Sequence, residues 1–290
     1  MNTQLSAAAP AQENELRQVE LEAQMKMRRR QNLVYTLRVA VMVVTLGGWE
    51  LAGRTGFIDP FFFSMPSQIA SQIWTWVTEG TSQGPLWVQV VVTLEETGLG
   101  FLIGGVGGII AGIALGRNKL LADVFSVYIK IANSIPRVVL GSVFIIALGL
   151  GMASKVALAV VMVFFVVFAN AFQGVREADR NLIANAHILG ASKRQVTASV
   201  VLPAAMSWIL ASLHVSFGFA LVGAVVGEFL GSRQGVGLLI STAQGAFNAA
   251  GVFASMIVLA VMALVAEFLL TQIENRLLKW RPPQFTEASH

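Results

Sequence analysis

Few residues in this sequence have the types and spacing that covalent chemistry needs. Glu95 and Glu96 form an adjacent carboxyl pair, but neighbouring positions on a helix point about 100° apart and do not converge on one substrate. We expect this pair to be interfacial, at the outer edge of a helix. His187, His214 and His290 are scattered without a ligand spacing, and the chain has no cysteine. The sequence therefore predicts no catalytic residue and no metal site.

Nucleotide chemistry has no signature in the sequence either. No glycine-rich loop ends in Lys followed by Ser or Thr, the pattern that cradles the phosphates of ATP. We therefore expect this chain to hold no cofactor and not to be an enzyme.

Polar residues inside apolar stretches are stronger candidates for function. Lys130, Arg137, Glu228 and Glu267 lie in or beside such stretches, where an ionisable group costs about 3 kcal/mol or more unless it is paired or wetted. For Arg137, either snorkelling to the membrane surface or a place in a translocation pathway fits. For Glu228 we expect a place in the pathway or in a gate.

A second polar region follows Glu228. Residues 231–251 are rich in Gly, Ser and Gln, and they include Gln244 and Asn248, which we add to the pathway candidates with Lys130, Arg137 and Glu228. This region is either a re-entrant gate loop or an ordinary external loop.

The elements that position these residues are membrane helices. The chain has 290 residues, of which 55% are hydrophobic and 12% charged, and its mean hydropathy is +0.69. Soluble domains carry about 25% charged residues. About 20 apolar residues in a helix cross a bilayer core of roughly 30 Å, and a backbone in lipid must satisfy its own hydrogen bonds. We expect about six spans, near residues 33–51, 97–115, 138–150 (with a less apolar lead-in from 120), 156–172, 208–230 and 252–270.

The basic residues predict the orientation of these spans. Most of the 20 lysines and arginines fall before the first span, in residues 176–195 and after the last span, whereas Arg54, Lys155 and Arg233 fall in segments assigned to the outside. The positive-inside rule then places both termini in the cytoplasm. Residues 1–32 form a solvated extension or, over 13–30, a surface helix, and they show no signal peptide. Residues 33–280 form the membrane domain, and 281–290 form a cytoplasmic tail.

One span carries a packing pattern. Glycine recurs at every fourth position, at Gly100, Gly104, Gly108, Gly112 and Gly116. This spacing strips one helix face of side chains and lets a second backbone approach closely. We expect a helix–helix contact there and no contact with a transported molecule.

The segment between the fourth and fifth spans reads DRNLIANAHILGASKRQVTASVVLP, from Asp179 to Pro203. Asp179 is a suitable N-cap for a short helix with Leu182, Ala186 and Leu189 on one face, and Gly190 can close that helix in the left-handed conformation. Ser192 then caps a second short helix, and Pro203 marks the start of the fifth span. From the residues alone, this amphipathic segment lies either on the bilayer surface or in a groove of a soluble partner.

This segment resembles the coupling loop of ATP-binding-cassette (ABC) importer permeases, whose signature is Glu-Ala-Ala, three residues, Gly, nine residues, Ile, any residue, Leu-Pro. The matching positions are Ala184, Asn185, Ala186, Gly190, Val200, Leu202 and Pro203. The spacing agrees throughout, but Ala stands at 184 where the family has Glu. That departure removes a carboxylate that could pair with the ATPase, and it leaves the docking helix in place.

Two further stretches resemble the permease subfamily of importers for nitrate, sulfonates, taurine and related compounds. They are SIPRVVLGSVFIIALGLGMASKVALAVVMVFF, residues 134–165, and VVGEFLGSRQGVGLLI, residues 225–240. With the loop, the resemblance covers about residues 66–282.

The resemblance implies a type I importer permease fold in the bacterial inner membrane. Two copies would form the pathway for a small anionic solute, two cytoplasmic ATPases would bind ATP and Mg, and an extracytoplasmic binding protein would deliver the solute. The ATPases would grip the loop 176–203 at these positions: Asp179, Leu182, Ala184, Asn185, Ala186, His187, Gly190, Ser192, Leu202 and Pro203. The alternatives are a proton-coupled secondary transporter that uses Glu228, and a membrane scaffold without transport; neither explains the spacing that ends in Leu-Pro.

Overall fold

The structure is a computed structural model that describes residues 4–277; the predicted tail 281–290 lies outside this range. Every regular element in the described range is a helix, and its one β-type pairing is an isolated bridge between Thr81 and Gly84. The chain divides into two compact units, with the boundary between Ser67 and Gln68. An all-helical architecture was predicted from the sequence, and it is confirmed.

The first unit consists mainly of α1 (Gln4–Arg54) and α2 (Pro60–Phe63). α1 is one continuous helix, and its apolar part, Met25–Arg54, is long enough to cross a membrane. At its end, the Glu50 carboxylate accepts hydrogen bonds from the backbone N–H and the hydroxyl of Ser67, at 3.0 and 2.9 Å, and from Arg54 Nε at 2.8 Å. These bonds fold the end of the unit back onto α1.

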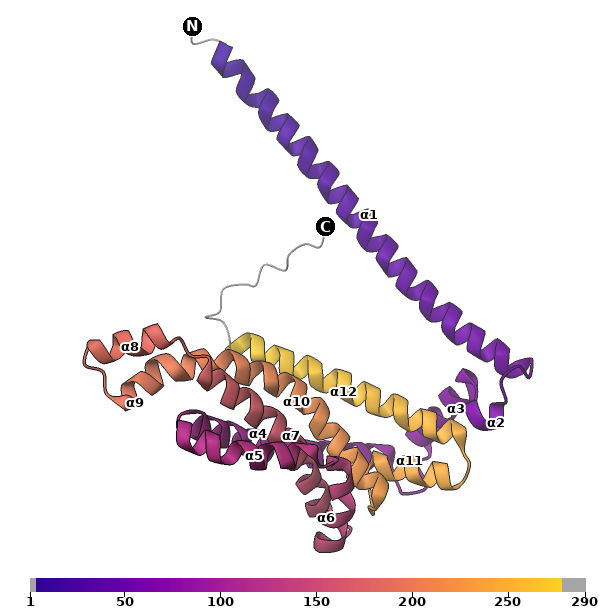
Figure 1. Ribbon diagram of the computed structural model, residues 1–290. Helices are drawn as coiled ribbons and strands as arrows, with labels where there is room; N and C mark the ends of the chain where they lie inside the picture. The colour runs from indigo at the N-terminus through magenta and orange to yellow at the C-terminus, as the bar shows by residue number, and fades with distance from the viewer. Residues whose placement is uncertain (1–3, 278–290) are drawn as a thin grey trace. The chain divides into compact units, whose positions relative to one another are not determined.

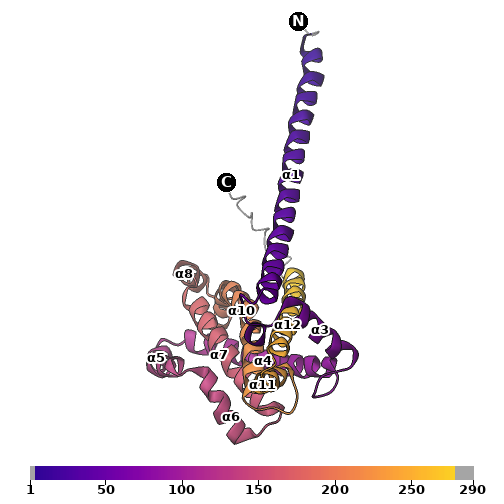
Figure 2. The same ribbon diagram turned by 90° about the vertical axis from the view of Figure 1, so that its right-hand side faces the viewer.

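The second unit contains the remaining long helices (Figures 1 and 2). Its elements are α3 (Pro66–Thr78, which begins in the first unit), α4 (Leu86–Gly116), α5 (Lys119–Ser134), the 3₁₀ turn η1 (Arg137–Val139), α6 (Leu140–Leu148), α7 (Met152–Arg176), α8 (Arg180–Ile188), α9 (Lys193–Val196), the π-helical segment η2 (Thr197–Val201), α10 (Leu202–Leu230), α11 (Val236–Gly245) and α12 (Ala249–Leu277).

The expectation of about six spans is confirmed. In the described range, five helices are long and apolar enough to cross a membrane, and the bent pair Leu120–Ala132 and Arg137–Leu148, which meet at 72°, makes six when it is counted as one span. The bend follows from Pro136, which lacks a backbone donor and holds Ile135 in extended backbone. The other spans run longer than the hydropathy pattern predicted, because polar residues extend the helices beyond their apolar centres.

The glycine face of α4 packs against α7, as predicted. A Cβ added at Gly112 would lie 2.6 Å from Ala171 Cβ and 2.8 Å from the Phe168 carbonyl, and one at Gly104 would lie 2.7 Å from the Val160 carbonyl. The two backbones therefore approach as closely as small residues allow. α10 covers another side of α7 in the same way, since Gly223 faces the backbone of Ala159.

Candidate functional site

The predicted loop between α7 and α10 forms two short helices. The Asp179 side chain accepts from the backbone N–H of Asn181 at 2.8 Å and caps α8. Gly190 closes α8 with a φ of +82°, and the N–H of Ala191 donates to the Ala186 carbonyl at 3.0 Å. The predicted cap and the predicted left-handed glycine are thus confirmed.

The second helix, α9, continues into the membrane span. Ser192 and Gln195 form a reciprocal capping box at its start, which confirms the predicted cap. α9 then runs through η2 into α10, so that Lys193–Leu230 is one helical run of 38 residues. Pro203 lies in the first turn of α10, but no loop precedes it.

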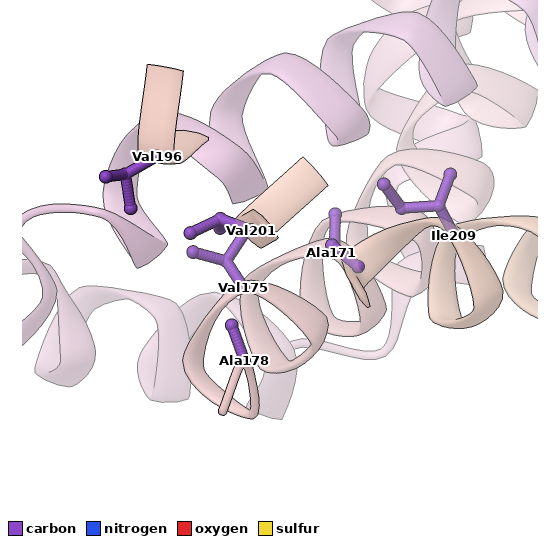
Figure 3. Close-up of a cluster of buried hydrophobic side chains, with 7 residues drawn as sticks. Ala171, Val175, Ala178, Val196, Val201 and Ile209 are labelled. Carbon is purple, nitrogen blue, oxygen red and sulfur yellow. The ribbon is translucent and has the colours of Figure 1, made fainter. Parts of the chain in front are cut away.

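The inward face of this segment is an apolar cluster drawn in Figure 3. The buried members come from α7, the residues between α7 and α8, and the run from α9 to α10: Ala171, Val175, Ala178, Val196, Val201, Ala205 and Ile209. Ile183, Ala186 and Ala191 pack against them. The cluster fixes the two short helices to the ends of the long ones.

The residues predicted to share one face of α8 differ in exposure. Ala186 packs inward, but Leu182 and Leu189 are 55% and 87% exposed, and Ile188 is 81% exposed. Ile183 packs inward beside Ala186, so the face of α8 that meets the cluster runs through these two residues. α8 therefore keeps one apolar face in the cluster and presents a second one outward.

The other predicted coupling residues lie mostly at the surface. Exposed members are Asp179, Ala184, Asn185, His187, Ser192 and Pro203, and Leu202 is partly buried. This end of the molecule thus offers an outward surface of apolar and small polar side chains, which we call the α8 surface: Leu182, Asn185, His187, Ile188 and Leu189.

A second site is a buried polar cluster at the other end of α10. Its members are at most 2% exposed: Gln89, Thr93 and Glu96 of α4, Lys155 of α7, and Glu228 of α10. The three α4 residues share one helix face at i, i+4 and i+7. A glycine lets α10 and α7 meet closely here. Gly227 of α10 lies against the Lys155 side chain of α7, and a Cβ added at Gly227 would lie 3.1 Å from Lys155 Cγ.

The hydrogen bonds of this polar cluster converge on the start of α11. Thr93 Oγ1 donates to Glu228 Oε1 at 2.7 Å and accepts from the backbone N–H of Val236 at 2.9 Å. Glu228 Oε2 accepts from the N–H of Gly237 at 2.6 Å. Gln89 Oε1 accepts from the N–H of Gly235 at 2.8 Å.

Two members of the cluster were misplaced by the sequence analysis. Glu96 was expected at the outer edge of its span, but α4 begins at Leu86, ten residues earlier, so Glu96 lies inside the helix and is 2% exposed. Its neighbour Glu95 is exposed, which confirms that the two carboxyls do not converge. Lys155 was assigned to an outer segment, but it lies in the first turn of α7, where Nζ donates to the Leu150 carbonyl at 2.7 Å.

The cluster brings two carboxyl groups and one ammonium group together in the interior. Glu96 and Glu228 are close enough to interact directly, and Lys155 lies near enough to attract both. Glu96 Oε2 is buried and, among the described residues, finds no hydrogen-bond partner. The signal that could have found this site is the run of polar residues at four- and three-residue spacing through positions 89, 93 and 96.

The remaining pathway candidates lie outside the cluster. Lys130 is exposed on α5, and the Arg137 guanidinium lies 5.1 Å from the centre of the Phe165 ring, within cation–π range. Gln244 is exposed at the end of α11, and Asn248 accepts from the Gly251 N–H at 2.9 Å. The structure therefore does not gather the five candidates into one site.

Comparison with known proteins identifies the chain. Residues 104–279 match the family described as the binding-protein-dependent transport system inner membrane component. The chain belongs to this family. The permease is 30% identical over 238 residues to the Bacillus subtilis protein SsuC, named as a putative aliphatic sulfonates transport permease, over 82% of this chain and 85% of SsuC.

The names of two further relatives give other solutes. The formylaminopyrimidine transport permease protein ThiX of Halalkalibacterium halodurans is 26% identical over 81% of the permease and 92% of ThiX. The taurine transport system permease protein TauC of Escherichia coli is 27% identical over 84% of the permease and 90% of TauC.

Solved structures share the fold of the permease. An inward-facing MetNI methionine ABC transporter chain matches with a TM-score of 0.52 and 18% identity, over 65% of the permease and 92% of that chain. An amino acid ABC transporter chain matches with a TM-score of 0.53 and 17% identity, over 67% and 92%. The type I importer permease fold expected from the sequence is therefore confirmed, and the chain is an ABC importer permease subunit.

Proposed function

We propose that this permease works as a homodimer that carries a small organic or inorganic anion, such as a sulfonate, taurine or nitrate, into the cytoplasm. Two separate ATPases would bind ATP and Mg, and an extracytoplasmic binding protein would deliver the solute. The membrane would be the bacterial inner membrane, with both termini cytoplasmic. The names of SsuC and TauC support an anionic solute, whereas the name of ThiX gives a formylaminopyrimidine. The choice of an anion therefore depends on the residues of this chain.

The α8 surface is the observation that carries the coupling part of this proposal. Ile188 and Leu189 are 81% and 87% exposed at the end of a helix whose other face is anchored in the apolar cluster. Large apolar side chains on a rigid, capped helix fit a groove of a soluble partner. An ATPase that binds this surface would move α8, α9 and α10 together.

Basic residues on α5 support an anionic solute. Asp123, Ser126, Lys130 and Ser134 follow one another at three- or four-residue spacing on α5, and Arg137 continues the series past the bend. Apolar residues lie between these positions, and Val124 and Val127 are among those that are exposed. Such a polar stripe in a membrane span is expected to face a water-filled path, and its two cations outnumber the one acidic residue, Asp123, which favours an anion.

Co-purification tests the coupling part. We expect the double substitution Ile188→Ser and Leu189→Ser to abolish retention of the ATPase by the tagged permease, because the variant loses the apolar anchors of the docking helix. Phe57→Ser is the matched control, since Phe57 is 88% exposed but lies in the turn after α1. ATPase retention that equals the control would contradict the proposal.

Solute uptake tests the anionic part. In liposomes that hold the permease, its ATPase and its binding protein, we expect Lys130→Gln and Arg137→Gln each to lower uptake of ethanesulfonate by about tenfold, the effect of losing roughly 1.4 kcal/mol of charge interaction. Arg233→Gln, which changes an exposed cation after α10, should leave uptake unchanged. Equal uptake by all three variants would exclude Lys130 and Arg137 from the pathway.

A further inference from the structure

The start of α11 is capped by side chains of other helices. α11 has ten residues, too few to cross a bilayer, and no side chain of its own N-cap residue, Gly235, can cap it. The first N–H groups of a helix have no partner within that helix. Here those of Gly235, Val236 and Gly237 are bound by Gln89 and Thr93 of α4 and by Glu228 of α10.

Glu228 fits this position by shape as well as by charge. A Cβ at Gly237 would lie 2.6 Å from Glu228 Cβ, and a Cβ at Gly235 would collide with the Glu228 carboxyl. The backbone of α11 therefore reaches the carboxyl only because both positions are glycine. A carboxylate at a helix N-terminus is also favoured by the helix dipole. The contact is thus specific to this helix start.

α10 connects this contact to the α8 surface. The helical run Lys193–Leu230 begins at α9 and ends two residues after Glu228. At 1.5 Å per residue, a run of that length spans about 57 Å. Figure 1 shows α8 and α9 at one end of α10 and α11 at the other end. A displacement of α8 and α9 would reach α11 through a single helix.

We propose that Glu228, Thr93 and Gln89 are positioning residues that hold α11 at the junction of α4 and α10, and that α10 acts through this contact to move α11 when the ATPases close. This inference rests on the proposed coupling of the α8 surface to an ATPase. A polar contact suits this role because Glu228 of α10 holds the start of α11 through a directed hydrogen bond to the N–H of Gly237, so that a shift of α10 carries the start of α11 with it. α11 would then be the movable part of the barrier at the outer end of the path.

Distances between spin labels can test the proposal, because the chain has no native cysteine. One label is placed at Val91→Cys on α4, which is 42% exposed, and the other at Ala246→Cys, just after α11, which is exposed. The complex with the ATPase is measured in nanodiscs, first without nucleotide and then trapped with ATP and vanadate. We expect the distance distribution to shift on trapping.

Matched variants separate positioning from folding. Thr93→Val removes the hydroxyl that binds Glu228 and α11, and we expect a broad distribution without a shift; Thr93→Ser keeps the hydroxyl and should restore the shift. Ser241→Ala on α11 is the control, since the Ser241 hydroxyl bonds only the Leu238 carbonyl of its own helix among the described residues. If the Thr93→Val complex does not assemble with the ATPase, Gln89→Met provides the same test of the distance shift, because it removes the side-chain oxygen that accepts from the Gly235 N–H.

Two results would overturn the inference. One is a trapping shift in Thr93→Val equal to that of the parent protein. The other is no shift in the parent protein while the complex hydrolyses ATP. Failure of the proposed function looks different, because the permease would then not retain the ATPase at all.

Discussion

At the scale of single residues, the contact between α4 and α7 depends on the missing side chains of glycine. We expect Gly112→Ala to destabilise the permease by about 1–3 kcal/mol, because its Cβ would lie within 2.8 Å of both Ala171 Cβ and the Phe168 carbonyl. Gly98→Ala on the same helix meets nothing within 4 Å, and it should be neutral or stabilise by about 0.5–1 kcal/mol. Thermal unfolding of both variants in detergent gives the comparison; equal melting temperatures would show that the two helices do not meet at Gly112.

Lys155 is the only cation among the five members of the buried polar cluster. We expect Lys155→Met to destabilise the fold by about 1–3 kcal/mol, because it removes the donor to the Leu150 carbonyl and the one cation beside two buried carboxyl groups. Adding Glu96→Gln removes one of the two acidic groups, and the double variant should recover part of the lost stability. Melting temperatures of the single and double variants test this coupling. If the second substitution lowers stability further, Lys155 does not serve both carboxyls.

The sequence predicted capping residues better than it predicted buried charges. Asp179, Gly190 and Ser192 are read from local rules, since a cap or a left-handed glycine depends on its immediate neighbours. Glu96 and Lys155 could not be placed in that way. Their burial depends on helices far along the chain that supply glycine faces and opposite charges, and hydropathy alone assigned both residues to the ends of spans.

At the scale of elements, the turn at Gly190 sets the direction of α9 relative to α8. Gly190→Val forces a β-branched residue to a φ of +82°, a strain of about 1–3 kcal/mol that the short segment can relieve by unwinding. We expect this variant to hydrolyse ATP without transporting solute. Gly190→Asn tolerates the same backbone conformation and should retain transport.

The ratio of solute transported to ATP hydrolysed is the measurement for Gly190. If Gly190→Val and Gly190→Asn transport the same amount of solute per ATP hydrolysed, the turn at Gly190 takes no part in coupling.

The number of membrane spans was predictable because each long apolar stretch requires a span. The start of α4, the bend at Pro136 and the helix α11 were harder to predict. Polar residues lower the hydropathy of the first turns of α4, and α11 lies in a region where glycine and polar residues favour a loop. The inward face of α8 was also ambiguous, because apolar residues occur on two sides of that helix and only the cluster that receives it selects Ile183.

At the scale of the whole molecule, orientation in the membrane follows from the basic residues. Single cysteines at Gln83, between α3 and α4, and at Arg194, in α9, should be on opposite sides, since one span, a bent pair and another span separate them. A membrane-impermeant maleimide added to whole cells should label the cysteine at position 83 and spare the one at 194. Labelling of position 194 from outside would reverse the orientation and place the α8 surface away from cytoplasmic ATPases.

The central claim is that an ATPase in the cytoplasm drives solute through this permease. It is tested most directly by uptake into liposomes that contain the permease and binding protein, with the ATPase present or omitted and with either ATP or an imposed proton gradient. We expect uptake only when both the ATPase and ATP are present, and none from the proton gradient alone. Uptake that persists on the proton gradient without the ATPase would contradict the account.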